Sequence, residues 1–156
     1  MRDVEAPALK KRNRRADNPT YTPVSCPPSN LRRKRLSSPT DVWMDLVHVR
    51  TALQEHFIVY DLNVRHHIIA MRIVHVGTLT GVEVHPREVF RGAILNSAAA
   101  VIFAHNHPSG DPSPSRQDLE LTARLREVGE LCGITVLDHI VVAADGYVSL
   151  AERGWV

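Results

Sequence analysis

Apolar residues follow two patterns along the chain. In some segments they recur every three to four residues, which predicts helices, and in others they form short continuous runs, which predict strands. The first segment with helical spacing follows Ser38, a typical capping residue, and Pro39, which suits the first position of a helix. The apolar positions of this predicted helix are Val42, Leu46, Val49 and Leu53. One face of the helix is therefore predicted to pack on a core.

Short apolar runs bounded by turn residues predict strands around two further helices. The predicted strands cover residues 57–62, 68–76, 99–104, 134–142 and 147–150, and the predicted helices cover residues 86–96 and 115–132. Gly133 follows the last helix as an expected C-terminal cap. The order of helix, hairpin, helix, strand, helix and hairpin is typical of a mixed sheet packed on helices, in an α/β or α+β fold.

Charge and composition divide the 156-residue chain into two parts. Residues 1–40 hold ten of the nineteen Lys and Arg and three of the seventeen acids, so their net charge is +7 (10 − 3), against −5 (9 − 14) for residues 41–156. Six of the ten prolines also fall in the first forty residues. We expect a disordered, basic, proline-rich arm over residues 1–37 and one globular domain over residues 38–156.

The basic arm predicts a weak contact with an anionic partner, nucleic acid in particular. Its basic clusters have no interleaved aromatic residues that could stack on bases, so a solvated leader without a partner is an equal alternative. No apolar run is long enough to span a membrane, and the first residues lack the apolar core of a secretory signal. With two cysteines, Cys26 and Cys132, we expect a cytoplasmic protein with reduced thiols.

The segment from His105 to Asp118 carries the candidate chemistry. His105 and His107 stand two positions apart at the end of a predicted strand, so both imidazoles can face one ion. Asp118 lies in the first turn of the following helix, behind a loop rich in Gly and Pro that can fold it back. Two imidazoles and one carboxylate leave an open fourth position on a tetrahedral zinc, which is typical of catalytic zinc sites.

The same residues also have ordinary explanations. Ser115 and Asp118 form an adequate helix cap without a metal, because the cap hydroxyl and the acid satisfy free backbone amides. A pair of histidines in a chain with nine of them is a weak signal when taken alone. Two histidines at the end of an apolar strand are nevertheless unfavourable to bury without partners. The combination of the pair with the acid favours a metal site.

The spacing H-x-H-x7-S-x2-D, formed by His105, His107, Ser115 and Asp118, is similar to the metal-binding signature of the JAB1/MPN (JAMM) metallopeptidase-like family. The flanking sequence resembles the bacterial RadC branch of that family. The matching segments are QEHF (54–57), GTL (77–79), VHPREVF (84–90), AHNHPSGDPSPS (104–115), LDHIVV (137–142) and YVSLAERGW (147–155). RadC proteins commonly carry an N-terminal helix-hairpin-helix module, and here the basic arm stands in its place.

This resemblance implies a three-layer α/β fold of the cytidine-deaminase-like type and one zinc ion per chain, held by His105, His107 and Asp118. It implies cleavage of a peptide or isopeptide bond in a protein or peptide substrate, with Ser115 as hydrogen-bond donor to the developing oxyanion. The general base of the family is a glutamate ahead of a strand, and Glu55 is the best match, although an ordinary exposed acid is the simple alternative.

Several residues near this signature are assigned lesser roles. A second acid typical of RadC proteins is replaced here by Arg72, just before the strand that leads to Gly77. Glu83 and Glu88 are weaker substitutes for the base, and His139 is expected to be a buried histidine satisfied by the backbone.

Two other functions stay open. The domain can be a non-catalytic or vestigial module associated with DNA repair or replication, with the basic arm contacting nucleic acid. The chain can also be a fragment of a larger gene product or a passenger of a mobile element. The sequence leaves the substrate and the oligomeric state open.

Overall fold

The computed structural model describes residues 34–77 and 84–156, and within these ranges it contains three helices and five strands. They are α1 (Pro39–Asp45), β1 (Glu55–Leu62), β2 (Ile68–Gly77), α2 (Pro86–Leu95), β3 (Ala100–Asn106), α3 (Arg116–Cys132), β4 (Thr135–Ala143) and β5 (Gly146–Ser149). The predicted arm up to residue 33, the Thr78–Leu79 part of the GTL segment and Glu83 lie outside the described residues.

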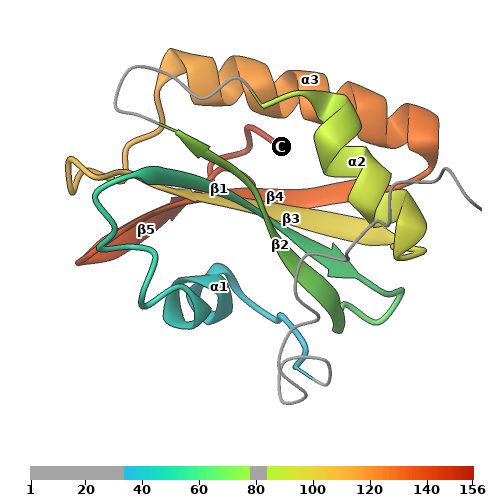
Figure 1. Cartoon of the computed structure of the whole chain (residues 1–156), viewed down its shortest axis with the longest axis horizontal. Coiled ribbons are helices and arrows are strands. Elements are labelled where there is room, and N and C mark those ends of the chain that lie inside the picture. Colours follow the sequence, from blue (N-terminus) through green and yellow to red (C-terminus); the bar gives the residue numbers. More distant parts are fainter. Residues whose placement is uncertain (1–33, 78–83) are drawn as a thin grey trace, which may run out of the picture.

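The five strands form one mixed sheet in the order β2-β1-β3-β4-β5. β1 runs antiparallel to both β2 and β3, β3 and β4 are parallel, and β4 and β5 are antiparallel. α1 covers one face of the sheet, while α2 and α3 cover the other, so the fold has three layers (Figure 1). This architecture confirms the predicted α/β class and mixed sheet.

Each face of the sheet has its own apolar core. The core beneath α1 is built around Val42, Ile58, Tyr60, Ile102 and Ile140. The core beneath α2 and α3 is built around Phe57, Val59, Phe90, Phe103 and Leu125. Alternate residues of β1 and β3 therefore serve opposite faces, as expected for strands buried on both sides.

The first helix is shorter than its apolar spacing predicts. α1 ends at Asp45, and the chain continues through a series of turns, with the amide of Arg50 donating to the carbonyl of Leu46. Leu53 is 88% exposed, so it does not belong to a buried helix face. The chain has to leave the α1 layer and return to the sheet at the start of β1 within a few residues, and this change of direction ends the helix.

β3 is longer than predicted, because it runs through His105 and Asn106 instead of ending at Ala104. It lies in the middle of the sheet, where His105 pairs with Phe57 on one side and with Val141 on the other. Backbone pairing on both sides keeps these polar residues in the strand. The first histidine is therefore held by the middle of the sheet rather than by a loop, and the second follows directly after it.

The folded body includes residues upstream of α1. Arg35 forms a bridge with His67, at the start of the hairpin partner β2, and Leu36 is buried in the α1-side core. Among the described helices, none is both long and apolar enough to cross a membrane.

Candidate metal centre

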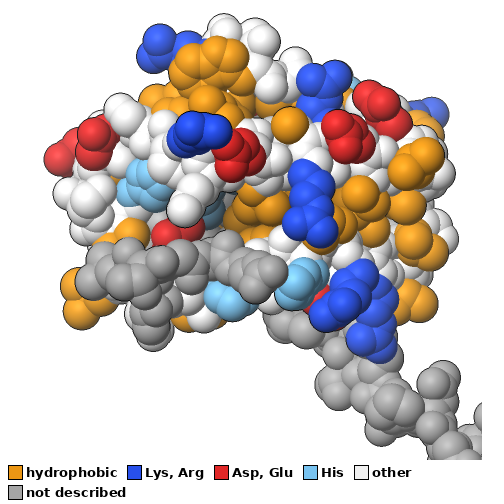
Figure 2. Space-filling model, turned by 90° about the horizontal axis from the view of Figure 1, so that it is seen from above, with side chains coloured by type: hydrophobic (Ala, Val, Ile, Leu, Met, Phe, Trp, Pro, Cys, Tyr) orange, Lys and Arg blue, Asp and Glu red, His pale blue; other side chains and the backbone are white. Residues whose placement is uncertain are grey.

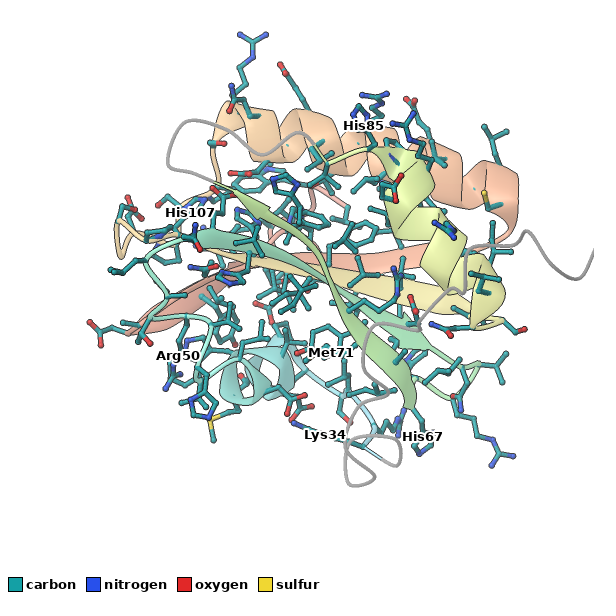
Figure 3. The ribbon with its side chains drawn as sticks, in the orientation of Figure 1. Lys34, Arg50, His67, Met71, His85 and His107 are labelled. Atoms are coloured by element: carbon teal, nitrogen blue, oxygen red, sulfur yellow. The ribbon has the colours of Figure 1, made fainter. Side chains whose placement is uncertain are left out.

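The structure brings together the three predicted metal ligands. His105 lies near the end of β3, His107 follows directly after the strand, and Asp118 lies in the first turn of α3. One candidate ligand atom from each residue lies within 4.8 Å of the others, so the group could hold a metal ion. Figure 3 shows His107 at the end of the sheet, below the start of α3.

The distances between the candidate ligand groups can be compared with those around a tetrahedral metal ion. Nε2 of His105 lies 3.0 Å from Nε2 of His107, and the Asp118 carboxylate oxygens lie 3.3 Å from His105 and 3.5 Å from His107. Ligand bonds of about 2.0–2.1 Å at tetrahedral angles separate two donor atoms by roughly 3.3 Å. The distances to Asp118 end on different oxygens, Oδ1 toward His105 and Oδ2 toward His107, so a rotation of the carboxylate would bring one oxygen to both imidazoles. With one ligand atom from each side chain, the group lies within 4.8 Å, close enough to hold a metal ion.

The hydrogen bond of Nδ1 of His107 determines which of its two ring nitrogens has a lone pair directed at the candidate metal centre. Its Nδ1 lies 2.8 Å from the backbone carbonyl of Asp111, and a carbonyl can only accept, so Nδ1 carries the proton. In neutral His107 the lone pair then sits on Nε2, directly toward Nε2 of His105. Two ring nitrogens at this separation repel each other unless a cation or a proton lies between them.

The carboxylate of Asp118 and the imidazole of His107 shift each other's pKa values. The hydrogen bond to Asp118 raises the pKa of His107 against the opposing effect of burial, and the negative charge of Glu55 adds to the rise. Burial alone would raise the pKa of Asp118, but the imidazoles of His105 and His107 beside its carboxylate outweigh burial and hold that pKa well below its ordinary value. The carboxylate is thus ionised and available as a ligand.

Ser115 is the N-cap of α3 and lies beside the metal centre. Its hydroxyl lies 3.2 Å from the amide of Asp118 and 2.7 Å from Oδ2 of that residue, and its own amide donates to the same Oδ2. The capping arrangement and the candidate metal site are therefore compatible, because Oδ1 of Asp118 remains directed at His105.

Glu55 is the first residue of β1 rather than a residue ahead of the strand. Phe57 pairs with His105, and continuing this antiparallel register by two residues sets Glu55 opposite His107. Side chains two apart share a face, so Glu55 lies on the same side of the sheet as both histidines. Glu88, a weaker candidate, is exposed in the first turn of α2, where its carboxylate meets Arg87.

Asn106, between the two histidines, is a residue of the candidate site that the sequence argument missed. Its buried side chain accepts from the amide of His56 at 2.8 Å and donates to the carbonyls of Ala52 and Gln54. These bonds fasten the backbone on both sides of Glu55 to β3. An amide side chain in an otherwise apolar central strand was the available signal, because such a group is buried only with partners.

His139 is buried as predicted, but the prediction that backbone groups satisfy its ring is wrong. The ring of this β4 residue does not bond the backbone, since its nitrogens contact His105 and Thr122. Burial, followed by the charge of His105, holds the pKa of His139 well below its ordinary value, so the ring is neutral.

The prediction for Arg72 is wrong in its place. Arg72 lies within β2 rather than before it, and it pairs with Val59 of β1. Its guanidinium forms two bonds to the buried carboxylate of Asp61, at 2.8 and 2.7 Å, and one to the carbonyl of Val89 in α2. The position at which the resemblance leads us to expect an acid is here part of a buried ion pair.

Comparison with known proteins agrees with this geometry. The family model for the RadC-like JAB domain matches residues 36–155. The chain is 50% identical over 124 residues to a UPF0758 protein of Syntrophotalea carbinolica, with 77% of this chain and 53% of that protein covered. It is 46% identical over 129 residues to a UPF0758 protein of Shouchella clausii, with 81% and 56% covered.

A UPF0758 protein of Methanosarcina mazei is 45% identical over 125 residues, with 80% of this chain and 55% of that protein covered. The chain therefore spans about half the length of these relatives. Their names carry no activity, and the similarity covers the part of this chain that holds the histidine cluster.

Proposed function

The chain belongs to the family of RadC-like JAB domains, and from this premise we propose that it is a zinc-dependent hydrolase that cleaves a peptide or isopeptide bond. The observation that carries the proposal is the convergence of two imidazole nitrogens and one ionised carboxylate on one point, close enough to hold a metal ion. A set of two histidines and one carboxylate leaves one position for the reacting groups, unlike a closed structural site.

His105, His107 and Asp118 would hold the ion. A zinc ion in such a site supplies a water of lowered pKa and polarises the scissile carbonyl. Glu55 is proposed as the general base, since its strand position sets it opposite His107 and its charge is felt there. Its carboxylate would take a proton from water and deliver that proton to the leaving amine.

Ser115 is proposed to stabilise the negative charge that develops on the substrate oxygen. Its hydroxyl now donates to Asp118, so the hydroxyl would rotate toward the substrate while its backbone amide keeps the cap bond. A donor of this kind is worth roughly 3–4 kcal/mol of transition-state stabilisation.

Metal content and cleavage in matched variants test this proposal. We expect the full chain, purified without chelators, to hold about one zinc by plasma mass spectrometry, and to cleave members of a panel of peptide and isopeptide conjugates. Glu55→Ala should keep the zinc and lose at least about a hundredfold in rate, because only the base is removed. His107→Ala should lose both.

The matched control is Glu127→Ala, which removes an exposed acid from the middle of α3 and should leave zinc and rate unchanged. A wild-type chain that holds no zinc under these conditions overturns the metal site itself. A chain that holds zinc but cleaves no conjugate overturns the hydrolase and favours a non-catalytic module associated with DNA repair or replication.

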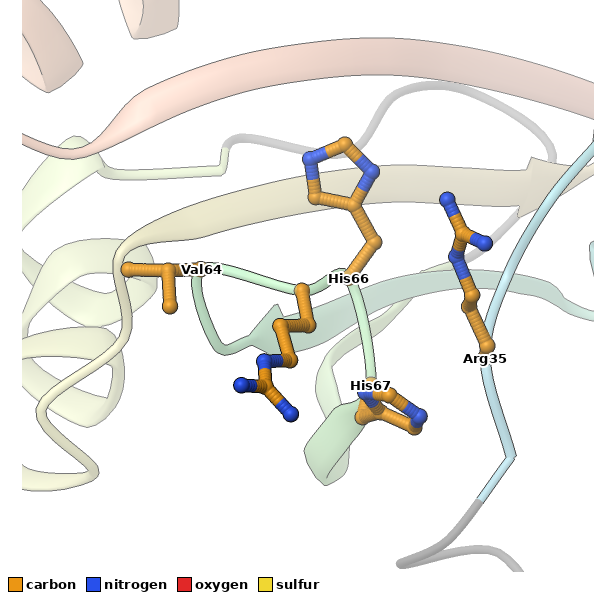
Figure 4. Close-up of a pocket in the computed structure, with 5 residues that line it drawn as sticks. Arg35, Val64, His66 and His67 are labelled. Atoms are coloured by element: carbon orange, nitrogen blue, oxygen red, sulfur yellow. The ribbon is translucent and has the colours of Figure 1, made fainter.

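A second candidate function, contact with nucleic acid, is favoured by a separate observation. A hollow of about 300 Å³ at the β1–β2 turn is lined by Arg35, Val64, Arg65, His66 and His67 (Figure 4). Within the described residues, neither arginine forms an ion pair with a carboxylate, and the face formed by α2 and α3 mixes acidic with basic side chains (Figure 2). Arg35 also continues the basic cluster that begins at Arg32.

Salt dependence of duplex binding by the full chain tests this candidate. Removing one phosphate contact lowers the slope of log affinity against log salt by about 0.9. We expect the double variant Arg35→Ser, Arg65→Ser to lower that slope by about two. The control Arg124→Ser, Arg153→Ser removes the same charge from exposed positions elsewhere, and an equal slope in both double variants overturns the candidate.

A further inference from the structure

A chain of buried hydrogen bonds connects two of the candidate ligands through the core. Thr122 in α3 bonds the carbonyl of Asp118 at 2.6 Å and Nδ1 of His139 at 2.5 Å. Nε2 of His139 in turn lies 2.8 Å from Nδ1 of His105. His105, Thr122 and His139 are all at most 1% exposed, so water does not compete for these groups.

Counting protons along this chain gives the direction of each bond. The carbonyl of Asp118 has no proton, so the hydroxyl proton of Thr122 must lie on that bond. The bond between Thr122 and His139 then takes its proton from Nδ1 of the imidazole. The His139 ring is fully buried edge-on to Phe57 and Phe103, where an extra proton would bury a positive charge among aromatic rings. The ring therefore has only that one proton, so its Nε2 accepts, and Nδ1 of His105 is the donor.

We propose that Thr122 and His139 are positioning residues that hold His105 with its proton on Nδ1 and its lone pair on Nε2, directed at the metal centre. This inference rests on the metal site of the proposed function, and it extends that site to two residues that touch neither metal nor substrate. The chain of bonds starts at the backbone of one ligand, Asp118, and ends at the ring of another, His105. It therefore couples the start of α3 to the end of β3.

Packing alone does not require this arrangement. The His139 ring stands edge-on to both Phe57 and Phe103, in surroundings where an aromatic hydrocarbon would pack without hydrogen bonds. Thr122 lies on the buried side of α3, where valine would fill the same volume. A polar pair in an apolar core is destabilising unless its bonds are complete, and here they are complete only through His105.

The tautomer of His105 in the metal-free full chain tests the proposal directly. Long-range ¹⁵N–¹H NMR of the imidazoles distinguishes a proton on Nδ1 from one on Nε2. We expect the Nδ1–H form for His105 in the wild type. Thr122→Val removes the acceptor for His139, so His139 can carry its proton on Nε2 and donate to His105, which shifts His105 toward the Nε2–H form.

Zinc affinity, measured by competition with a chromophoric chelator, should follow the tautomer. We expect Thr122→Val to bind zinc about 10–100-fold more weakly than the wild type, the range typical for partners of metal-ligating histidines. Thr122→Ser keeps the hydroxyl and should restore both tautomer and affinity. Thr40→Val removes an exposed threonine hydroxyl that meets Tyr147, and it should change neither.

A second substitution covers the case of a variant that fails to fold. His139→Gln keeps an acceptor for His105 and a donor for Thr122, and should retain more affinity than His139→Phe, which keeps only the ring volume. The proposal is overturned if wild-type His105 carries its proton on Nε2, or if Thr122→Val binds zinc as tightly as Thr122→Ser. Neither readout involves hydrolysis, so an inactive protein with the expected tautomer would reject the proposed function alone.

Discussion

The motif of a serine followed three residues later by an aspartate occurs at the start of two helices, with different consequences. Asp41 accepts from the amides of Ser37 and Ser38 at the start of α1. Asp118 accepts from the amide of Ser115 at the start of α3, and it also faces two histidines. Both arrangements are capping boxes, although a cap hydrogen bond to the serine side chain is present only at Ser115, so the motif itself predicts only a helix start.

The two caps differ in the residues that surround the aspartate. α3 begins beside the end of β3, which supplies His105, whereas Asp41 lies in the α1 layer, where Lys34 is the charged neighbour. A carboxylate whose hydrogen-bond acceptors are all satisfied by the helix cap has a structural role. A carboxylate that shares its site with unpaired lone pairs is a candidate for function. The predictions below test this distinction from both sides.

The largest effect on stability is expected from breaking a complete buried ion pair. Arg72→Met leaves the carboxylate of Asp61, which is 0% exposed, with Asn96 as its remaining side-chain partner among the described residues. We expect the free energy of unfolding to fall by about 3–5 kcal/mol in urea titrations, because an uncompensated charge stays buried. Zinc content per folded chain should not change.

A double variant separates the effect of the charges from an effect of packing. Arg72→Met with Asp61→Leu removes both charges and should recover most of the stability that the single variant loses. A double variant as unstable as the single one would mean that the shape of Arg72, which fills the space beside Gly92, matters more than its charge.

The next effect compares the two capping aspartates directly. Asp118→Asn should weaken zinc binding by at least about a hundredfold, equivalent to about 2.7 kcal/mol, because it removes the anionic ligand. Asp41→Asn should bind zinc like the wild type. Chelator competition measures both, and equal weakening in the two variants would show that the loss at Asp118 does not come from removing a metal ligand.

Much of this contrast could be predicted from the sequence, because it depends on local patterns. The spacing of His105, His107 and Asp118 predicted that these side chains would lie together as a group that could hold a metal ion, and apolar runs predicted the strands of the sheet. The sheet order and the partners of His139 depend on contacts between residues far apart in the chain. Leu53 was misassigned because spacing does not register a change in chain direction.

Arg72 and Asn106 show more clearly what could not be predicted from the sequence. Nothing near Arg72 in the sequence indicates that Asp61 lies beside it on the neighbouring strand. Asn106 reaches three backbone groups fifty or more residues earlier in the chain, and only the β1–β3 register brings them together. Polar residues with distant partners are therefore the part of the site that a single sequence leaves undetermined.

An intermediate effect on stability is expected from Asn106, whose side chain holds the backbone on both sides of the proposed base Glu55. Asn106→Ala removes the partner of the His56 amide and of two carbonyls beside Glu55, and should lower the free energy of unfolding by about 1–3 kcal/mol. Cleavage should fall as well, while zinc content stays at the wild-type value, since both histidines remain.

The matched variant is Asn63→Ala, whose side chain accepts from the amides of Arg65 and His67 in the β1–β2 turn. We expect a comparable loss of stability with unchanged cleavage. If both asparagine variants reduce cleavage in proportion to stability, the set of bonds from Asn106 around Glu55 has no specific role.

The smallest effect concerns Asp41, the structural member of the pair. Its pKa is lowered, first by the hydrogen bond from the Ser37 amide, so its contribution to stability is present above the unfolded value of 3.8 and is lost as pH falls through the lower folded pKa. Asp41→Asn should lower stability by roughly 0.3–1 kcal/mol at neutral pH. The wild-type advantage should vanish in acid, as urea titrations at pH 7 and below pH 3 would measure. An advantage that persists in acid would mean that the side chain acts through its shape rather than its charge, and the difference from Asp118 would then lie in more than the histidines.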